Sequence, residues 1–465
     1  MLVAALAGLL LSACEQSRLP PGADVGPQPT LPEPVPSRTV NVAPAQPWPE
    51  GQLPKPAPGL VLTEFARDLR HPRWVTVLPN GDVLVAESNA PEGKPSGIKG
   101  WIMKQVMKRA GAGNRSANRI TLLRDADGDG RAEVRHAFLE NLHSPFGMVL
   151  VDDRLVVANT DALIEFPYTP GQTRLELASG RRLAELPAGE RNHHWTKNVI
   201  ASPDGTRLFV TVGSNSNVAE NGIAEEEGRA AVWVVDRTSG AKRLFATGLR
   251  NPNGMAFTQD GVLWTVVNER DELGSDLVPD FLTSVRDGGF YGWPWSYFGR
   301  HVDTRVDPPR PDLVQRALVP EYALGAHVAP LGLAAVAHGP LTAALGGGGA
   351  ASAASGVGAA SSASGASEAS STSGSSVANG AAAPTAGMFV GLHGSWNRRP
   401  PSGYKVIFVP FADEKPQGKP IDVLTGFLSP QSEAWGRPVG VAIDTRGALL
   451  VADDVGNAIW RVAPR

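Results

Sequence analysis

The sequence predicts an all-β protein, a six-bladed β-propeller with four-stranded blades. Three observations lead to this fold class. A hairpin unit recurs six times along the chain, the copies are spaced widely enough for two further strands each, and the composition is rich in turn formers. Gly and Pro contribute 52 and 40 of the 465 residues, which is what a chain of many short strands requires.

Each repeat begins with a strand, turns at a Gly or Asp, and returns through a second strand that ends in small apolar residues before a polar loop. Corresponding prolines of two consecutive copies, Pro72 and Pro145, are 73 residues apart, and those of two later copies, Pro252 and Pro330, are 78 apart. The copies are HPRWVTVLPNGDVLVAESN, HSPFGMVLVDDRLVVANTD, NVIASPDGTRLFVTVGSNSN, NPNGMAFTQDGVLWTVVNERDE, VAPLGLAAVAHG continued by GMFVGLHGSWN, and RPVGVAIDTRGALLVADDVGN. Turns of the PNG or PDG kind between alternating apolar residues are hairpin signals.

Charge and composition exclude some classes of partner. Lys and Arg number 43 against 46 Asp and Glu, a formal charge of -3, and hydrophobic residues make up 42% of the chain. The chain can bury a large core but lacks the positive field of a phosphate-binding surface, so nucleic acid is not expected as a partner.

The N-terminus suggests an anchor. Residues 1–13 read as a lipoprotein signal peptide that ends in Leu-Ser-Ala before Cys14, the single cysteine, which would carry the lipid. A plain secretory signal or an ordinary apolar N-terminus are the alternatives. Residues 14–58 are Pro-rich and predict an extended tether, with the propeller over 59–465. We expect the protein on the periplasmic side of a bacterial membrane, the outer membrane being favoured, and held there only by the lipid.

Two segments depart from the repeat pattern. Residues 346–387 are almost entirely Gly, Ala and Ser, which predicts a disordered insertion. Ile98–Ala110 is basic with helical periodicity; it is expected to decorate a loop of the first blade, and contact with a membrane or partner is the alternative.

Because a hairpin returns the chain to its start, residues before the first strand and after the second strand of each unit should share one face. That face would gather imidazole and cationic groups, as an anionic, flat small molecule requires. The alternative is that polar loops merely cap the strands. The residues before the first strands are Arg70, His71, His143, His194, Arg250, Asn251, His327 and Arg437; those after the second are Glu87, Asn89, Asn159, Ser214, Asn215, Asn268, Glu269, His393 to Arg398, Asp453 and Asp454.

Longer motifs make the chain similar to a known family. These are GLRNPNGMAFTQDGVLWTVVNERDELGSDLVPDFLTSVRDGGFYGWPWSYFG from Gly248, NHHWTKNVIASPDG, and HGSWNRRPPSGYKVIFVPF. From about Leu60 to Val462 the sequence resembles the soluble pyrroloquinoline quinone (PQQ)-dependent glucose and sorbosone dehydrogenases, most closely the sorbosone-dehydrogenase-like branch.

The resemblance implies roles for individual residues. His194 would be the general base that takes the hydroxyl proton of a sugar while hydride passes to the quinone. Arg250 and Asn251 would contact the quinone oxygens, with Arg250 stabilising developing charge. Ca²⁺ would lie beside Glu269, bound by the cofactor and by the backbone carbonyls of Arg270 and Asp271. The remaining cofactor contacts are assigned to His143, Glu269, His327, Asn397, Arg398 and Arg437.

Some positions depart from the family pattern. His143 stands near the place of an expected glutamine, and His327 replaces a threonine of the glucose-oxidising branch. Arg270-Asp271 replaces a Gly-Pro pair. These departures argue against glucose as the substrate more than against the cofactor.

A second candidate calcium site is the DxDxDG loop formed by Asp125, Asp127 and Asp129 before Gly130. Its twelfth position is His136, where an EF-hand has Glu, so an Asp-rich turn without metal remains open. No GxGxxG motif follows a predicted strand, which leaves a nicotinamide or flavin enzyme unsupported.

The main hypothesis is therefore an oxidoreductase that passes electrons from a sugar or aldehyde-like substrate to bound PQQ and on to an external acceptor. Two alternatives stay open on a propeller: a calcium-dependent lactone hydrolase, and a non-enzymatic binding module. The fold alone does not separate them.

Overall fold

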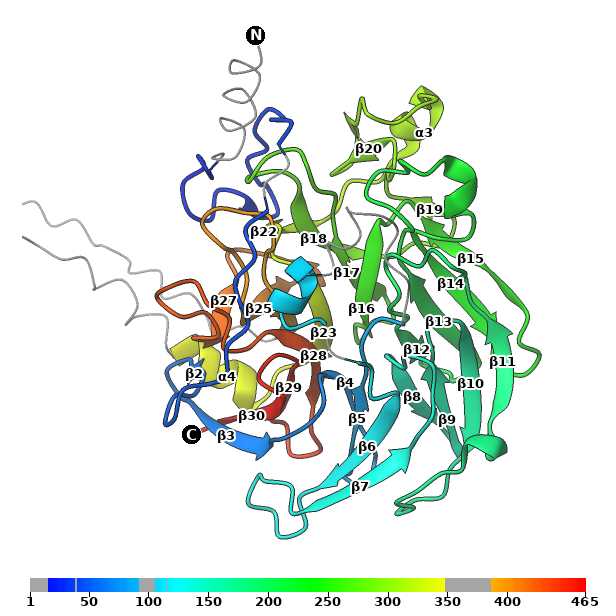
Figure 1. Ribbon diagram of the computed structural model, residues 1–465, viewed down its shortest axis with the longest axis vertical. Helices are drawn as coiled ribbons and strands as arrows, with labels where there is room; N and C mark the ends of the chain where they lie inside the picture. The colour runs from blue at the N-terminus through cyan, green and yellow to red at the C-terminus, as the bar shows by residue number, and fades with distance from the viewer. Residues whose placement is uncertain (1–15, 38–39, 92–104, 114, 348–385) are drawn as a thin grey trace, which may run out of the picture.

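The computed structural model describes residues 16–37, 40–91, 105–113, 115–347 and 386–465. Six antiparallel sheets radiate from a central axis, and the innermost strand of each sheet lies next to that axis (Figure 1). Each blade is built on four antiparallel strands, which are consecutive in the chain in blades 1 to 3, and three blades gain short extra strands. The predicted six-bladed propeller is thus confirmed.

The blades follow the chain, from the innermost strand outward. Blade 1 is β4 (Pro72–Val77), β5 (Val83–Glu87), β6 (Arg119–Arg124) and β7 (Val134–Leu139); blade 2 is β8 (Met148–Val151), β9 (Arg154–Ala158), β10 (Ala162–Pro167) and β11 (Arg181–Glu185). Blade 3 is β12 (Val199–Ala201), β13 (Arg207–Val212), β14 (Ala231–Asp236) and β15 (Lys242–Thr247), joined by β19 (Gly289–Phe290). Blade 4 is β16 (Asn251–Phe257), β17 (Leu263–Asn268), β18 (Pro279–Ser284) and β22 (Tyr322–Ala326).

The last two blades use strands from both ends of the chain. Blade 5 is β23 (Pro330–Val336), β24 (Ala386–Leu392), β25 (Lys405–Ala412) and β27 (Ile421–Thr425), with β26 (Lys415–Pro416) on β25; blade 6 is β28 (Pro438–Ile443), β29 (Leu449–Asp453), β30 (Ala458–Pro464) and β3 (Leu60–Ala66). Outside the blades lie η2 (Leu177–Ser179), η3 (Ile223–Glu226), α3 (Pro311–Arg316), α4 (Pro340–Gly347), and the pair β20 (Ser296–Tyr297) and β21 (His301–Val302).

The ring is closed by pairing the beginning of the propeller with its end. Strand β3 runs antiparallel to β30, with Leu60 opposite Pro464 and Leu62 opposite Val462. Because the first strand of the propeller is the outermost strand of the last blade, the hydrogen bonds of one sheet join both ends of the ring. Closure of this kind holds the ring together without a disulfide.

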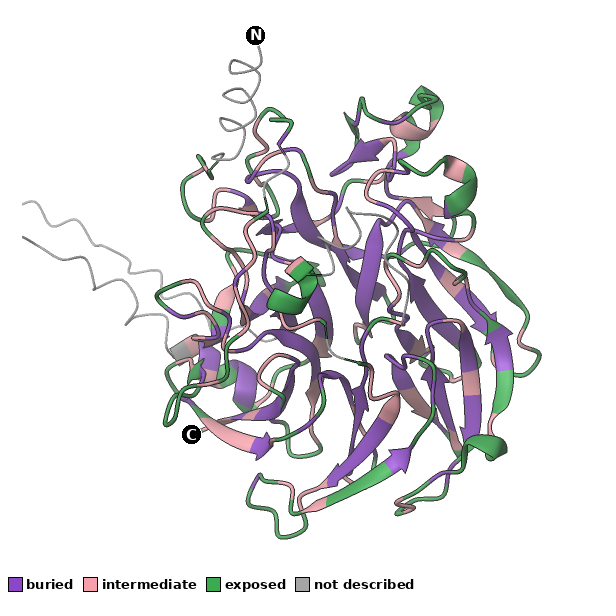
Figure 2. Ribbon diagram, in the orientation of Figure 1, coloured by how far each residue is buried: buried purple, intermediate pink, exposed green. Residues whose placement is uncertain are grey.

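The core lies between neighbouring sheets, where buried strands surround the axis and exposed residues lie on the outer strands and turns (Figure 2). Close approach of the innermost strands depends on small residues. At Gly332 of β23, a Cβ atom would collide with the carbonyl oxygen of Val439 in β28 of the next blade. The Pro-x-Gly beginning of this strand is therefore a packing requirement as well as a turn signal.

The Pro-rich N-terminal segment lies on the propeller, contrary to a free tether. Its described part, residues 16–37 and 40–58, contributes β1 (Val25–Gly26) to blade 4 and β2 (Lys55–Pro56) to blade 5. In Figure 1 this blue segment runs past the labels of β22 and β27, with which β1 and β2 pair. A proline-rich chain cannot pair all of its own backbone N–H and C=O groups. Here the edges of two sheets provide partners for some of them, and composition alone does not predict this pairing.

An aromatic contact fixes the same segment to blade 6. The Trp48 indole donates to Asp453 Oδ2 at 3.1 Å, and its ring lies 5.8 Å from the rings of Phe427, Trp435 and Trp460. Asp453 also accepts from the Trp460 indole at 3.1 Å. The two indoles thus bind one buried carboxylate, and burial raises the pKa of Asp453 to about 6.

Some expectations fall outside the described residues. These are Cys14 with the signal peptide, residues 348–385 of the insertion, and residues 98–104 of the expected helix. Residues 105–109 of that helix are helical, lie between β5 and β6 as expected, and contact the N-terminal segment through a bond from the Ala45 amide to the Arg109 carbonyl, 2.8 Å long. Among the described helices, none has the length and apolarity to cross a membrane.

Replacing Trp48 by Ala should destabilise the whole propeller if the segment is part of the folded domain. The change removes a half-buried aromatic ring and one hydrogen bond to Asp453, and we expect a loss of about 2–4 kcal/mol in unfolding free energy. Denaturant unfolding would measure it, with exposed Glu50→Ala in the same segment as control. Equal stability of the two variants would show that the segment is dispensable.

Candidate active site

Topology places two sets of loops on one face of the propeller. The chain enters β16 through Arg250 and Asn251 and leaves β17 through Asn268 to Asp271, and Asn251 lies opposite Asn268 in the sheet. The same holds for β28 and β29, where Pro438 lies opposite Asp453. The expectation that residues before the first strand and after the second strand meet on one face agrees with this pairing.

Asp271 links blades 4 and 5 on this face. Its carboxylate lies 3.3 Å from Arg250 Nη2, 2.6 Å from Asn397 Nδ2 and 3.5 Å from His327 Nδ1. Burial alone would raise the pKa of Asp271, but the charge of Arg250 and the hydrogen bond from His327 hold the pKa below its usual range. Burial lowers the pKa of His327, yet Asp271 outweighs burial and the net shift is upward.

Asp454 links blades 6, 1 and 5 in the same way. Oδ2 is bonded to Arg73 Nη1, lies 2.9 Å from His393 Nε2 and 3.5 Å from His71 Nε2, and the residue is 1% exposed. Burial would raise the pKa of Asp454, but His393, His71 and Arg73 hold it well below its usual range. Burial lowers the pKa of His71 to about 4 and also lowers that of His393, so Arg73 is the partner that carries charge at neutral pH.

These two carboxylates correct the expected picture of a basic face. Arg250 is paired with the partly exposed Asp271 and Arg73 with the buried Asp454, and the histidines around Asp454 are neutral near pH 7. The reason is general: a charge taken out of water must be cancelled by a partner. Around Asp271 and Asp454 the face therefore presents balanced ion pairs joined by imidazole and amide groups.

His194 is positioned as a neutral imidazole with one nitrogen available. Its Nδ1 lies 2.8 Å from the Ser214 carbonyl oxygen and 3.0 Å from Ser214 Oγ. Because a carbonyl only accepts, Nδ1 carries the hydrogen and Nε2 keeps its lone pair. Burial, followed by the charges of His193 and Arg250, lowers the pKa of His194 well below 6.5. The ring is half-buried, whereas neighbouring His193 is exposed.

Gly213 allows His194 and Asn251 to approach each other. A Cβ atom at Gly213 would collide with both Asn251 Oδ1 and His194 Cβ. The Oδ1 atoms of Asn251 and Asn397 and the Nε of Arg437 are buried without a hydrogen-bond partner in the described structure. Unpaired buried polar atoms of this kind are uncommon and indicate a place for a polar ligand.

The remaining predicted cofactor residues fall into different surroundings. Arg437 stacks on Tyr404, with its guanidinium carbon 4.9 Å from the ring centre, and contacts the Ala43 carbonyl at 3.4 Å. His143 is exposed and pairs with Asp161 at 3.2 Å. Arg398 donates to the Ser275 carbonyl at 2.8 Å, Ser17 Oγ at 3.0 Å and Asp276 at 3.1 Å. In this structure Arg398 thus holds the N-terminal segment, a contact that sequence reasoning missed.

Two carbonyls of the loop expected to bind Ca²⁺ are already hydrogen-bonded to side chains. The Asp271 carbonyl accepts from Arg305 Nη1 at 3.0 Å and Asn217 Nδ2 at 3.2 Å, and the Glu269 carbonyl accepts from Arg250 Nη1 at 2.6 Å. The side chains of Glu269 and Arg270 form a buried ion pair of 3.0 Å with each other. Of the two carbonyls predicted to bind Ca²⁺, that of Asp271 is thus already taken by two hydrogen bonds.

The DxDxDG loop forms a compact acidic turn between β6 and β7. Ligand atoms of Asp125, Asp127, Asp129 and Glu133 lie within 4.8 Å of one another. Asp125, however, is paired with Arg446 and accepts from the Gly128 and Gly130 amides. Glu133, which the sequence analysis did not single out, completes the group.

Two further buried groups were missed by sequence reasoning. Asp280 accepts from the Glu269 and Ala329 amides at 2.7 Å each, and burial raises its pKa to about 7. Lys197 donates to the His194 and Trp195 carbonyls at 3.4 and 3.3 Å, and burial lowers its pKa to about 7. Both sit next to a repeat loop, which was the available signal; their burial depends on neighbouring blades.

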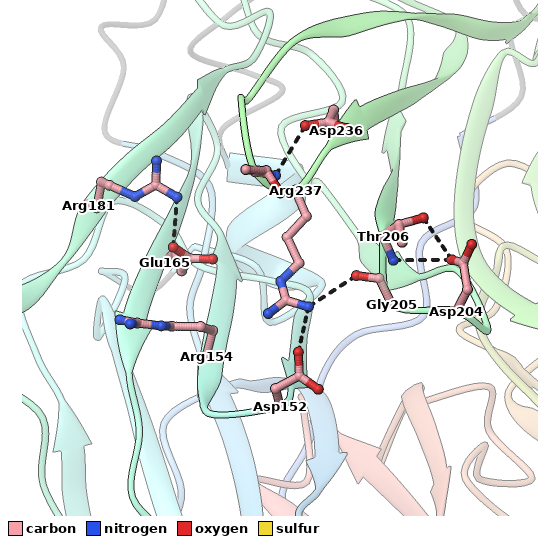
Figure 3. A pocket seen from close by; sticks show the side chains of 10 residues that line it. Asp152, Arg154, Glu165, Arg181, Asp204, Gly205, Thr206, Asp236 and Arg237 are labelled. Atoms are coloured by element: carbon pink, nitrogen blue, oxygen red, sulfur yellow. Dashed lines mark hydrogen bonds and ion pairs between the residues drawn. The ribbon is translucent and has the colours of Figure 1, made fainter.

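A hollow of about 860 Å³ lies away from this face, among hairpin turns of blades 2 and 3 (Figure 3). Two of its arginines are paired, Arg181 with Glu165 and Arg237 with Asp152, at 2.8 Å each. Thr206 and Asp204 bond to each other within one turn. The hollow is a surface of mutually paired charges and contains none of the predicted site residues.

The sequence matches a known family over residues 54–280 and 314–465, most of the propeller. The chain belongs to the TrAA12-like family. An uncharacterized protein of Borreliella burgdorferi is 21% identical over 337 residues, which span 70% of this chain and 77% of that protein.

Solved structures agree with this TrAA12-like assignment at the level of the fold. The Trichoderma reesei Carbohydrate-Active Enzymes Family AA12 protein, in its iodide structure, covers 92% of this chain and is itself covered fully, with 16% identity and a TM-score of 0.65. The pyranose dehydrogenase PQQ domain of Coprinopsis cinerea is 19% identical, with a TM-score of 0.64. That match covers 91% of this chain and 99% of the Coprinopsis chain. The soluble aldose sugar dehydrogenase of Escherichia coli is 13% identical, with a TM-score of 0.53. That match covers 87% of this chain and 100% of the Escherichia coli chain.

Replacing Asp454 by Ala should strongly destabilise this TrAA12-like propeller. The change leaves the buried Arg73 guanidinium without its counter-charge, and breaking such a pair costs about 3–5 kcal/mol. Thermal and denaturant unfolding would measure the loss. Asp287→Ala, which breaks the exposed pair with Arg243, is the control and should change stability far less; comparable losses would contradict the assigned role of Asp454.

Proposed function

We propose that this protein is a quinoprotein oxidoreductase that oxidises a sugar or an aldose- or sorbosone-like substrate with PQQ. Membership of the TrAA12-like family supports the proposal, as does the shared fold with the Coprinopsis cinerea PQQ domain. The observation that carries it is the state of His194, a neutral imidazole whose Nδ1 is held by Ser214 and whose Nε2 is a base.

Residues on the same face as His194 offer both hydrogen-bond donors and acceptors to a quinone. Arg437 has a buried Nε without a partner, and the Asn251 and Asn397 amides each keep an unpaired oxygen. One hydrogen of Arg250 Nη1 is also left over, since its other four N–H groups bond to the protein. Arg437, Asn251, Asn397 and Arg250 would hold the cofactor, which supplies the acceptor for the hydride leaving the substrate carbon.

The residues of the protein itself would remove the proton of the substrate hydroxyl group. His194 Nε2 takes the proton of the substrate hydroxyl, and the Nδ1–H bond to the Ser214 carbonyl strengthens as the imidazole becomes positive. Ser214 Oγ donates to the Ser216 carbonyl at 2.7 Å, which leaves its lone pairs facing Nδ1. Turnover would also require an external electron acceptor.

The calcium-dependent lactone hydrolase is less well supported. In the described part of the chain, acidic and imidazole ligand atoms gather at metal-binding distances only in the Asp125 to Glu133 turn. That turn lies between the two outer strands of blade 1, away from the axis. A non-enzymatic binding module would share the polar face but has no need of a prepared base such as His194.

Replacing His194 by Gln should abolish sugar oxidation while quinone binding survives. Loss of a general base costs about 100- to 10,000-fold in turnover, whereas cofactor contacts come from other residues. Dye reduction across a sugar panel and absorbance titration with PQQ would measure the two effects. His193→Gln is the matched control and should keep turnover within about tenfold. A His194→Gln enzyme with normal turnover would remove the mechanism, and a wild-type protein without quinone binding would remove the proposed function.

The pH dependence of turnover follows from the pKa of His194. A base must be unprotonated, and a pKa held well below 6.5 keeps His194 neutral as pH falls through 6.5. We therefore expect kcat/KM to stay level through that range and to fall only at lower pH. The profile should be measured with a substrate that has no ionisable group. An acid limb at or above pH 6.5 would contradict the assignment.

A further inference from the structure

The guanidinium of Arg250 lies in a cage of protein oxygen atoms. Nε is 3.2 Å from the Asn217 carbonyl, Nη1 is 2.6 Å from the Glu269 carbonyl, and Nη2 is 3.0 Å from Asn217 Oδ1 and 3.3 Å from Asp271 Oδ2. Arg250 is 4% exposed. Two carbonyls, one amide oxygen and one carboxylate oxygen are the ligand types that Ca²⁺ takes from proteins.

The neighbouring carbonyl is closed to a metal as well. Asp271 O accepts two hydrogen bonds, from Arg305 Nη1 and Asn217 Nδ2, which uses both of its lone pairs. Arg305 is itself held by Asp303, with contacts of 2.9 and 2.7 Å. Two arginines from different loops therefore direct N–H groups at the oxygens that would otherwise ligate a cation.

The charge at this place is already balanced. Asp271 is the one carboxylate in direct contact with Arg250, and His327 adds positive character beside it. The nearby carboxylates of Glu269 and Asp303 are already paired with Arg270 and Arg305, so a divalent ion would have to share Asp271 with the fixed guanidinium. Repulsion at these distances is large in a buried setting.

We propose that Arg250 is a built-in cation that takes the place of Ca²⁺ in this loop, so that the protein binds its quinone without calcium. That the protein binds a quinone rests on the proposed function. That Arg250 fills a cation site does not, because this concerns only whether the surrounding oxygen atoms accept a metal once Arg250 is removed.

The decisive variant is Arg250→Ala, which empties the cage and leaves its oxygen atoms in place. Tb³⁺, a luminescent substitute for Ca²⁺, provides the readout, because the Trp293 indole donates to the Asn217 carbonyl at 2.9 Å and lies close enough to sensitise it. All proteins should carry Asp127→Asn and Asp129→Asn, exposed changes that disable the separate acidic turn.

In this background we expect Tb³⁺ luminescence excited through tryptophan, displaced by Ca²⁺, in Arg250→Ala and not in the Arg250 parent. Adding Asp271→Asn to Arg250→Ala should abolish the signal, since it removes the anionic ligand. Ca²⁺ should likewise raise the unfolding temperature of the Arg250→Ala protein, and not that of the parent or of the protein that also carries Asp271→Asn. A folded Arg250→Ala protein that gives no metal response, or a parent that responds equally, would overturn the cage.

The second measurement uses the wild-type protein and needs no variant. PQQ affinity from absorbance titration should be the same, within about twofold, in excess EDTA and in millimolar Ca²⁺. Loss of binding in EDTA with recovery in Ca²⁺ would overturn the proposal even if Arg250→Ala fails to fold. If PQQ binds in neither medium, the proposed function fails, and the Tb³⁺ experiment still decides whether Arg250 fills a cation site.

Discussion

Charge that leaves water at the centre of the propeller has to be cancelled there, and this requirement organises the whole candidate site. Two aspartates meet it, Asp271 for blades 4 and 5 and Asp454 for blades 6, 1 and 5. Each follows the second strand of its own blade and reaches residues that precede the first strand of another. The ion pairs thus connect neighbouring blades on the active face, while the β3–β30 pairing connects the two ends of the ring.

This arrangement explains why His194 differs from the other histidines. His71 and His393 contact Asp454, and His327 contacts Asp271, so each is held by a carboxylate, although only His327 has its pKa raised by that contact. His194 has no carboxylate among its recorded partners and is fixed by the Ser214 carbonyl and hydroxyl. With positive groups nearby and no acid to favour protonation, its imidazole stays neutral. The same electrostatics that stabilise the ring prepare a base at one point on it.

The repeat pattern was enough to predict the propeller because it is local: each hairpin is read from a strand, a turn and a strand. The face on which the loops gather followed from the same topology. The pairing of charges did not, since Arg73 and Asp454 are 381 residues apart and nothing near either residue identifies its partner. For the same reason composition did not predict that the described part of the segment over residues 14–58 packs on the propeller. Its composition is that of an extended chain, but Trp48 docks on Asp453, 405 residues away.

The unpaired atoms on the active face define what a ligand has to bring. The Asn397 amide is oriented without ambiguity, because Nδ2 must be the atom 2.6 Å from the Asp271 carboxylate, which leaves Oδ1 as an unsatisfied acceptor. Arg437 Nε is an unsatisfied donor on the same face. Each buried atom of this kind costs about 1–3 kcal/mol until it is paired. A ligand that recovers this energy needs both a hydrogen-bond donor and a negatively charged or carbonyl acceptor, and a purely apolar or purely cationic molecule cannot supply them.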